Sequence, residues 1–420
     1  MKPLMRSIAL PPLPAVLLFA AAMLCDLQPA SAQQSQIPMA EYDALVALHS
    51  ATGGAGWTNK WTLPTDNPCG LFGVTCTGGR VVQLQLPANQ LNGTLPQQLG
   101  NLGALTRLYL NNNQLGGAIP AELGALVGLQ ELRLNSNQLS GAIPAELGSL
   151  ASLQELRLNS NQLGGTIPPE LGALVSLRDL RLNNNQLGGA VPPGIGNLSS
   201  LQYLILSLNQ LSGPIPPELG NLGSLRQLWL NNNQLSGAIP PGLGNLGSLQ
   251  EIVLNDNRLS GAIPASLGNL NSLLSLFLGS NQLSGEIPPE LCNLGNLVTL
   301  SLGYNQLSGA IPLQLGGLVS VQYLNVRGNQ LRGAIPPGLA SLGGLKSIWI
   351  DNNYQLSGPL PLSLSVLRPS IFYFHNTQLC EPDDAGFQAW LNGIPDLKRT
   401  GVICGQALQR RSLIPLVLKQ

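Results

Sequence analysis

Residues 105–129 read LTRLYLNNNQLGGAIPAELGALVGL, and close variants of this string fill most of the 420-residue chain. One asparagine marks the period, because it returns every 24 residues from Asn89 to Asn353. A fixed period of about 20 to 50 residues is typical of a solenoid, in which each unit buries its apolar face against the next. The repeat therefore predicts one elongated α/β solenoid, with twelve coils over residues 81–368.

The first half of each coil carries the pattern of a strand followed by a bend. Because L-x-L alternates as a strand does, Leu108 and Leu110 are expected to point inward and Arg107 and Tyr109 outward. The next asparagine suits the bend, since its amide can bond backbone groups there. Stacked over the coils, these amides are predicted to form a structural ladder, and each one left unpaired would cost about 1–3 kcal/mol. The ladder residues are Asn113, Asn137, Asn161, Asn185, Asn209, Asn233, Asn257, Asn281, Asn305 and Asn329.

The second half of each coil carries glycine and proline. Gly117 and Pro120 restrict the outer side of their coil to one or two helical turns. The motif L-S-G-x-I-P stands at residues 139–144, 211–216, 235–240, 259–264, 283–288 and 307–312. This pattern resembles the plant-type family of leucine-rich repeats, and the resemblance covers about residues 40–404. The family implies a right-handed arc with a parallel sheet on its concave face, short 3₁₀ helices on its convex side and a cap at each end.

Residues 33–80 depart from the repeat and are expected to cover the open N-terminal edge of the first coil. They contain a helical pattern near residues 40–54, followed by Trp57 and Trp61. The two tryptophans are assigned to the cap, with ligand binding as the alternative. The segment is similar to the N-terminal cap of the family, in which Phe72 would take the place of the usual tryptophan.

Residues 369–404 are expected to form the C-terminal cap. Phe372 and Phe374 fit the inward positions of a thirteenth strand, and residues 383–391 fit a short helix. Residues 405–420 form a tail with a short apolar run. That run resembles the apolar C-terminal tails of some exported bacterial proteins, and a disordered end is the alternative.

Residues 1–32 have the pattern of a secretory signal peptide. A basic start with Lys2 is followed by an apolar run at residues 15–24 and by the small-x-small sequence at residues 30–32. A membrane anchor is the alternative, but the run is too short to span a bilayer. A lipid-modified Cys25 is a weaker alternative, because the bulky Leu24 precedes it. We therefore expect a secreted or cell-surface protein, cleaved near Ala32.

The remaining cysteines support an oxidising location. Cys69 lies close to Cys76, and Cys380 lies near Cys404, so each pair is expected to form a disulfide. A zinc site is the alternative, but it would need four ligands close together. Cys292 stands where sister repeats have glycine and has no assigned role. Two glycosylation sequons begin at Asn92 and Asn197, and they matter only in a host that glycosylates.

The composition argues against several classes of function. Charged residues make up 10% of the chain, with 20 basic and 20 acidic side chains, whereas a nucleic-acid binder needs a surplus of basic residues. The two histidines, His49 and His375, have no catalytic or metal partner at a recognisable spacing. The sequence contains no kinase motif and no apolar run long enough for a transmembrane anchor. We expect no enzyme activity, no cofactor, no metal and no nucleic-acid partner.

Function is expected at the outward strand positions, because the residues there vary from repeat to repeat, whereas the leucine, asparagine, glycine and proline residues that shape the coil do not. Three repeats carry an acid followed by an arginine: Glu131/Arg133, Glu155/Arg157 and Asp179/Arg181. The three arginines are candidate binding residues. The alternative is that the pairs neutralise one another on the surface, each contributing less than about 1 kcal/mol.

The later repeats carry large apolar side chains at outward positions. They are Tyr203, Ile205, Trp229, Val253, Phe277, Tyr304, Tyr323 and Trp349. Exposed aromatic residues are enriched in binding hot spots, and packing against one another across the strands is the alternative.

The sequence thus predicts a receptor-like or inhibitor-like protein that binds an extracellular protein or peptide on its concave face, with a glycan as a further possible ligand. The regular polar rows that include Asn111, Asn112, Asn135, Asn159, Asn183 and Asn231 support a second hypothesis, a matrix protein that binds polysaccharide.

Overall fold

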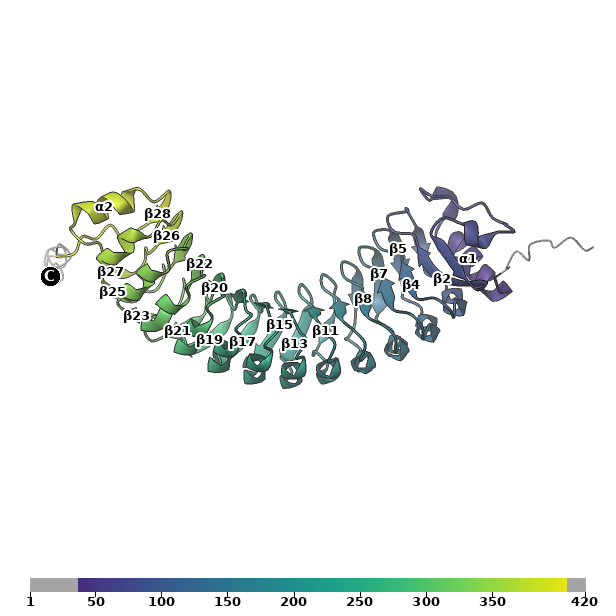
Figure 1. Ribbon diagram of the computed structural model, residues 1–420, viewed down its shortest axis with the longest axis horizontal. Coiled ribbons are helices and arrows are strands. Elements are labelled where there is room, and N and C mark those ends of the chain that lie inside the picture. The colour runs from purple at the N-terminus through teal and green to yellow at the C-terminus, as the bar shows by residue number, and fades with distance from the viewer. Residues whose placement is uncertain (1–36, 406–420) are drawn as a thin grey trace, which may run out of the picture. The chain divides into compact units, whose positions relative to one another are not determined.

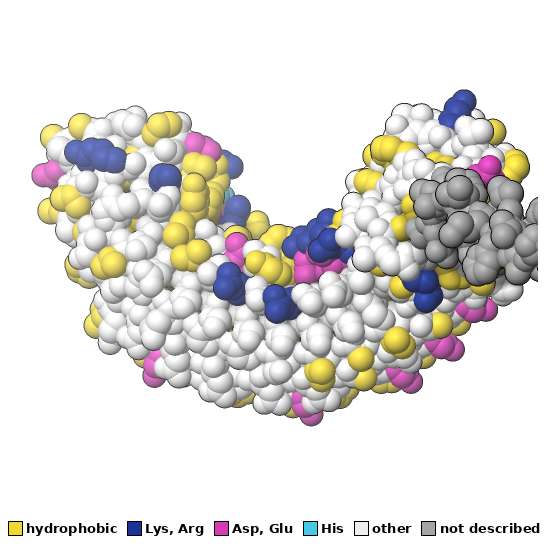
Figure 2. Space-filling view, turned by 45° about the vertical axis from the view of Figure 1, so that its right-hand side comes forward, with side chains coloured by type: hydrophobic (Ala, Val, Ile, Leu, Met, Phe, Trp, Pro, Cys, Tyr) yellow, Lys and Arg dark blue, Asp and Glu magenta, His cyan; other side chains and the backbone are white. Residues whose placement is uncertain are grey.

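Each 24-residue repeat closes one coil, which consists of an inner strand, a short second strand and a 3₁₀ helix. The computed structural model describes residues 37–405, and their coils stack into a curved solenoid whose inner strands line the concave surface (Figure 1). The space-filling view shows that this concave surface is open (Figure 2). The signal-like segment 1–32 and the tail after residue 405 lie outside the described residues.

The inner strands form one 15-stranded sheet within the described residues. They are β1 (Val74–Thr77), β2 (Arg80–Gln85), β4 (Arg107–Tyr109), β6 (Glu131–Arg133), β8 (Glu155–Arg157), β10 (Asp179–Arg181), β12 (Tyr203–Ile205), β14 (Gln227–Trp229), β16 (Glu251–Val253), β18 (Ser275–Phe277), β20 (Thr299–Ser301), β22 (Tyr323–Asn325), β24 (Ser347–Trp349), β26 (Ile371–Tyr373) and β28 (Asp396–Lys398). Only β1 runs antiparallel to its neighbour; the other described pairs in this sheet are parallel. Because the period is constant, each central leucine pairs with the central leucine of the next coil, as Leu108 does with Leu132.

Short 3₁₀ helices cover the convex side, as the resemblance implied. They are η3 (Gln97–Asn101), η4 (Ala121–Ala125), η5 (Ala145–Ser149), η6 (Pro169–Ala173), η7 (Pro193–Asn197), η8 (Pro217–Asn221), η9 (Pro241–Asn245), η10 (Ala265–Asn269), η11 (Pro289–Asn293), η12 (Leu313–Gly317), η13 (Pro337–Ser341) and η14 (Leu362–Val366). Each begins directly after the proline of the motif, whose fixed φ suits a helix start. Glycine in these helices permits close stacking, since a Cβ at Gly268 would lie 2.3 Å from the Glu290 carbonyl oxygen of the next coil.

A second set of strands lies between the inner strands and the 3₁₀ helices, and the sequence analysis did not anticipate it. The strands are β3 (Asn92–Thr94), β5 (Gln114–Gly117), β7 (Gln138–Ala142), β9 (Gln162–Gly164), β11 (Gly188–Gly189), β13 (Gln210–Pro214), β15 (Gln234–Gly237), β17 (Arg258–Ala262), β19 (Gln282–Glu286), β21 (Gln306–Ser308), β23 (Arg332–Gly333), β25 (Gln355–Pro359) and β27 (Gln378–Cys380). They contain glycine, which is a poor strand former, so pairing with the neighbouring coil holds them extended.

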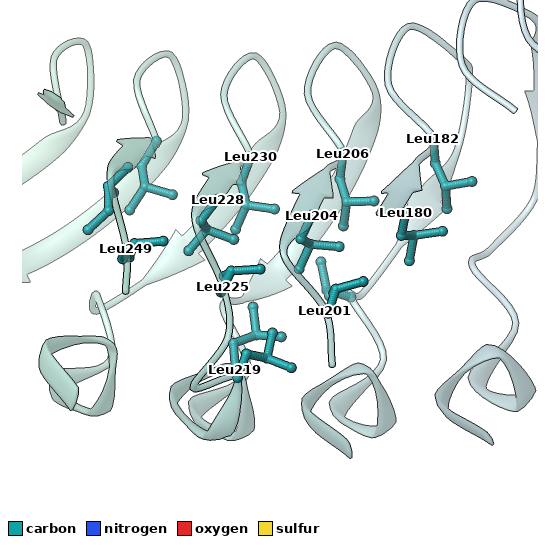
Figure 3. Packing of buried hydrophobic residues seen from close by; sticks show 14 of the residues in the cluster. Leu180, Leu182, Leu201, Leu204, Leu206, Leu219, Leu225, Leu228, Leu230 and Leu249 are labelled. Carbon is teal, nitrogen blue, oxygen red and sulfur yellow. The ribbon is translucent and has the colours of Figure 1, made fainter. Parts of the chain in front are cut away.

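The core is a stack of aliphatic side chains that repeats from coil to coil. Figure 3 shows Leu180, Leu204 and Leu228 at the same place in three successive coils, and all three are fully buried. Each fully buried leucine contributes about 1.5–3 kcal/mol, before the entropy cost of ordering its coil. Every coil therefore needs its neighbours, and the two end coils need caps.

The asparagine ladder runs through the bend that follows each inner strand. At Asn281, Oδ1 accepts a hydrogen bond from the Leu259 N–H of the preceding coil at 2.9 Å. Its Nδ2 donates to the Leu254 carbonyl of that coil at 3.0 Å and to the Leu278 carbonyl of its own coil at 3.1 Å. The same three kinds of contact occur at Asn113, near one end, and at Asn353, near the other. Each amide thereby links two coils.

The N-terminal cap consists of α1 (Met39–Ala51), η1 (Gly54–Gly56), η2 (Pro68–Gly70) and β1. Trp57 and Trp61 are 1% and 5% exposed, and their indole N–H groups donate to the carbonyl oxygens of Thr52 and Phe72. This burial fits a cap role and leaves no ring face for a ligand. Phe72, expected at the place of the usual tryptophan of the family, has a side chain that is 49% exposed, whereas Leu71 packs against the core.

Each of the two caps contains one disulfide. Cys69 and Cys76 are joined in the N-terminal cap, with a Cα–Cα distance of 5.6 Å. Cys380 and Cys404 are joined in the C-terminal cap, at 5.0 Å. That cap also contains α2 (Ala385–Asn392) and β28, which extends the concave sheet beyond β26 and which the sequence analysis did not predict.

Candidate binding surface on the concave face

The concave strands present two columns of outward side chains, from the first and the third residue of each strand. The parallel register places Glu131, Glu155 and Asp179 in the first column, and Arg133, Arg157 and Arg181 in the second. Residues 24 apart are therefore neighbours on this surface, although they are distant in the sequence. The charge and the hydrophobicity of each part of the surface depend on which residue types stand in these two columns.

The charged residues of the N-terminal coils join into one continuous ladder. Figure 2 shows basic and acidic side chains side by side on the concave surface. The ion pairs, in order along the arc, are Arg107–Glu131 at 3.0 Å, Arg133–Glu131 at 3.0 Å, Arg133–Glu155 at 2.6 Å, Arg157–Glu155 at 2.8 Å, Arg157–Asp179 at 2.8 Å and Arg181–Asp179 at 2.9 Å. Three of these pairs connect successive coils and three lie within one strand, so the ladder has the geometry of the self-neutralising alternative. The arginine side chains remain 30–39% exposed, so a ligand could still reach them.

Tyr109 extends the ladder at its N-terminal end. Its hydroxyl donates a hydrogen bond to Glu131, and the Arg133 guanidinium lies 4.3 Å from the centre of its ring. Burial and this hydrogen bond raise the pKa of Tyr109 to about 12. Partial burial pushes the pKa of Glu131 upward, but hydrogen bonds from Tyr109 and Arg107 and the charge of Arg133 outweigh it, so this pKa lies below its usual value. Glu131 therefore stays ionised at neutral pH.

The aromatic residues of the later coils stand apart from one another. Among the described residues, none of the rings of Tyr203, Trp229, Phe277, Tyr304, Tyr323 and Trp349 forms a stacked or edge-to-face pair with another ring. Packing against one another therefore does not explain them. Tyr304 is 53% exposed and Tyr323 is 37% exposed; Trp229, Val253, Phe277 and Trp349 are half-buried.

Ile205 is a correction to the predicted binding residues. It occupies an outward position but is only 3% exposed. Its register neighbours are Arg181 and Trp229, whose long side chains flank it on both sides. An isoleucine between two larger side chains is covered by them, so Ile205 packs beneath the surface and cannot serve as an exposed contact.

Two adjoining hollows lie among the aromatic residues, with volumes of about 400 and 390 Å³. Both are lined by Phe277, Ser301 and Asn325. The first also includes Val253, Asn255, Asp256, Gly279, Ser280, Gly303 and Tyr304, and the second includes Thr299, Leu300, Tyr323 and Trp349. The pair forms one continuous depression across β16 to β24. A larger hollow of about 740 Å³ lies apart from it, between η14 and α2 in the C-terminal cap.

The walls of this depression contain residues predicted from the sequence, whereas the residues of its floor were not predicted. The walls are large side chains such as Phe277 and Trp349, whereas the floor is made by small ones, Ser301, Gly279 and Gly303. A signal was present, since most earlier coils have asparagine where Gly279 and Gly303 stand. A hollow requires small residues beside large ones, and only the stacking of coils shows which residues adjoin.

A buried polar cluster lies beyond the depression, toward the C-terminal end. The Asp351 side chain is fully buried, and its Oδ2 lies 3.0 Å from Arg327 Nη2 and 3.8 Å from His375 Nε2. The Arg327 guanidinium also lies 5.2 Å from the centre of the Tyr304 ring. These contacts hold Tyr304 and Arg327 in place at the border of the first hollow.

The described residues offer little evidence of a metal site, a membrane-spanning helix or a reactive thiol. Between residues 37 and 405, no group of three or more His, Cys, Asp or Glu side chains is arranged to hold a metal ion. Within the same range, no helix has the length and apolar character needed to span a membrane. Cys292 is a free, buried thiol in η11, and burial and nearby Glu290 raise its pKa to about 11. Such a thiol is unreactive and fits a packing role.

Comparisons with known proteins identify these coils as leucine-rich repeats. The family model described as a leucine-rich repeat region matches residues 159–282, and the leucine-rich repeat model matches residues 104–126, 128–150, 272–294, 296–318 and 320–342. A probable inactive receptor kinase of Arabidopsis thaliana, RLK902, is 42% identical over 67 residues, which are 16% of this chain and 10% of the relative.

Two solved structures resemble most of the described chain. The ectodomain of the Arabidopsis thaliana receptor kinase GASSHO1/SCHENGEN3, in complex with CASPARIAN STRIP INTEGRITY FACTOR 2, is 36% identical, with a TM-score of 0.75 over 84% of this chain and 46% of its own. The Arabidopsis receptor kinase HAESA, in complex with the peptide hormone IDA and the co-receptor SERK1, is 30% identical, with a TM-score of 0.65 over 85% of this chain and 68% of its own. This chain thus spans about a tenth of the curated relative and about half of the first structure.

The chain belongs to the leucine-rich repeat family, and its repeats are of the plant type found in receptor-kinase ectodomains.

Proposed function

We propose that this protein is a secreted, non-catalytic binding protein that recognises a protein or peptide on its concave face. The observation that carries the proposal is the depression across β16 to β24, which is walled by aromatic rings that pack against no other ring among the described residues. Apolar side chains around a hollow can anchor a partner, and residues of this kind dominate the energetics of many interfaces.

Similarity to receptor ectodomains supports the same conclusion. HAESA binds a peptide hormone, and the fold it shares with this chain presents a concave sheet to solvent. The two disulfides support an extracellular location, because disulfides persist in oxidising compartments. Secretion itself rests on the signal-like residues 1–32.

The proposed contacts differ in role. Phe277, Tyr323 and Trp349 line the depression and would anchor the ligand. Val253 lines its N-terminal edge, and Tyr203 and Trp229 border it toward the N-terminal coils. Arg133, Arg157 and Arg181 would contact a longer ligand only through guanidinium edges that the ladder leaves exposed.

The experiment begins with capture of the partner by crosslinking the secreted protein in its native medium. Binding of the captured partner is then compared between the wild type and Trp349→Ala, Phe277→Ala and Trp229→Ala variants. Truncating an anchor should weaken binding by about tenfold or more, while thermal unfolding changes little, since these side chains lie outside the core cluster. The matched control is Tyr354→Ala, which removes a 66% exposed ring that does not line the depression. Unchanged binding by all three variants would refute the proposal.

A regular polar edge supports a second candidate, binding of polysaccharide by a matrix protein. Asn111, Asn135, Asn159 and Asn183 occupy the same position in four successive coils, two residues after the end of the inner strand. Their spacing of roughly 4.8 Å per coil presents amides at a regular interval to an extended ligand. Retention on insoluble polysaccharide, lost in an Asn135→Ala/Asn159→Ala/Asn183→Ala variant, would favour this candidate; retention unchanged by the triple substitution would exclude this edge.

A further inference from the structure

The first hollow of the depression has an acidic border. Asp256, Ser280 and Tyr304 occupy the same turn position in three successive coils, with φ of 55°, 54° and 58°. At about 4.8 Å per coil, Asp256 and Tyr304 stand roughly 10 Å apart, with the small Ser280 between them. Gly279 and Gly303 line the hollow, and Phe277 also adjoins it. The result is a slot with a carboxylate on one side and an aromatic ring on the other.

Asp256 lacks the cation that pairs with most of the other carboxylates of the described concave strands and turns. The acids of the N-terminal ladder pair with arginines, and Asp351 pairs with Arg327. Glu251 accepts hydrogen bonds from the Trp229 indole and the Gln227 amide. Within residues 37–405, Asp256 has no cation within 4.0 Å, and its side chain accepts only the Asn255 amide at 2.5 Å. Its charge is free to attract a cation from a ligand.

The protein itself builds the complementary arrangement one coil away. Arg327 places its guanidinium 5.2 Å from the centre of the Tyr304 ring and 3.0 Å from Asp351. Guanidinium groups favour this combination, because they stack on aromatic rings and pair with carboxylates at the same time. Arg327 thus covers part of the Tyr304 ring from the C-terminal side, whereas on the other side of the slot Asp256 has no cation within 4.0 Å among residues 37–405.

We infer that this slot binds a basic side chain, Arg or Lys, of the peptide that occupies the concave face. The inference rests on the proposed function and adds that the concave site prefers a positively charged ligand side chain. The guanidinium or ammonium group would pair with Asp256 while its aliphatic stem lies against Phe277 and Tyr304. The slot has no other charged lining residue, so a neutral or acidic side chain would leave Asp256 unpaired.

The test uses the full chain and peptides of defined sequence. A random peptide display library is selected against the immobilised protein, and the selected peptides are examined for enrichment of Arg and Lys. The tightest arginine peptide is then synthesised beside an analogue in which citrulline replaces that arginine, which removes the charge and keeps the shape. Both peptides are measured against the wild type, Asp256→Asn and Asp383→Asn. The last variant is the control, because it removes one charge from an exposed residue of the C-terminal cap.

The inference expects the citrulline peptide to bind the wild type about tenfold more weakly than the arginine peptide, from an exposed ion pair and a cation–π contact together. In Asp256→Asn the difference should shrink to less than about twofold, while Asp383→Asn should behave as the wild type. Equal affinities of the two peptides for the wild type, or a difference that Asp256→Asn leaves intact, would overturn the inference.

The same experiment separates this inference from the proposed function. If selected peptides lose binding in Phe277→Ala and Trp349→Ala but show no preference for a basic residue, the concave site stands and the acidic slot is refuted. If no peptide is selected, or selected peptides bind the two variants as well as the wild type, the proposed function fails and the inference fails with it.

Discussion

Replacing a central ladder asparagine, Asn281→Ala, should cost more than any change of similar size on the surface. The side chain accepts the Leu259 N–H and donates to the carbonyls of Leu254 and Leu278, and it is only 9% exposed. Alanine leaves one N–H and three carbonyl groups, the third being that of Gly279, without this partner, in a bend that water reaches poorly. The unpaired N–H alone costs about 1–3 kcal/mol, and the two lost amide donors add roughly 1 kcal/mol each, so we expect a loss of about 3–5 kcal/mol.

The assay should be local, because a long array of coils need not unfold in one step. Hydrogen exchange at the Leu259 amide measures opening at the ladder itself, and a loss of about 1–3 kcal/mol there corresponds to exchange roughly 5- to 150-fold faster. Urea unfolding followed by circular dichroism gives the total change. The matched control is Asn269→Ala, an exposed asparagine in η10 whose side chain makes no hydrogen bond to another residue between 37 and 405.

A graded variant sharpens the test. Asn281→Thr should lie between wild type and Asn281→Ala, because threonine at the equivalent place of the last coil, Thr377, both donates to the Phe374 carbonyl and accepts from the Leu379 N–H. If Asn281→Ala stays within about 0.5 kcal/mol of Asn269→Ala and exchange at Leu259 is unchanged, the ladder does not hold the coils together and the reasoning is refuted.

Three further predictions concern packing, pH and reactivity. Gly268→Ala should lower the free energy of unfolding by about 1–3 kcal/mol, because its Cβ would lie 2.3 Å from the Glu290 carbonyl oxygen. Cys292→Gly, at the same place of the next coil, should change the free energy of unfolding by less than about 1 kcal/mol. Equal losses of the two variants in urea unfolding would contradict this prediction. Glu131 has a folded pKa below 4.5, so its contribution exists at neutral pH and is lost as pH falls from about 4.5 through the folded pKa. Glu131→Gln should therefore be less stable than wild type by up to about 1 kcal/mol at pH 7, and this difference should shrink as the pH falls below about 4.5; a constant difference would be inconsistent with the ladder. Cys292, with its pKa raised to about 11, should resist iodoacetamide at pH 8 in the folded chain and react in denaturing urea, as read by mass spectrometry of its peptide; rapid labelling of the folded chain would show that the thiol is accessible.

Much of the coil could be predicted from single letters of the repeat. The L-x-L alternation placed Leu108 and Leu110 in the core, and both are fully buried. The glycine and proline of the motif limited the convex side to short helices, and η3 to η14 are five residues each. The second strands were missed because their own composition disfavours a strand, and the bonds that hold them extended come from the next coil.

The candidate site was predicted less well, for a related reason. Its aromatic walls could be recognised because an aromatic at an outward position breaks the pattern of the coil. Its floor could not, because Ser301, Gly279 and Gly303 are unremarkable letters until large residues of neighbouring coils stand beside them. The same dependence on neighbours buried Ile205, which the strand alternation had placed at the surface.

The sequence by itself determined which side chains of each coil point inward, because a strand of fixed alternation and a constant 24-residue period leave one register for the whole array. It also determined that function is confined to the outward letters. Only the tertiary structure decided which outward side chains are solvent-accessible, which form ion pairs and which line a hollow. Those properties depend on side chains of adjacent coils that lie 24 residues away in the chain and about 4.8 Å away in space.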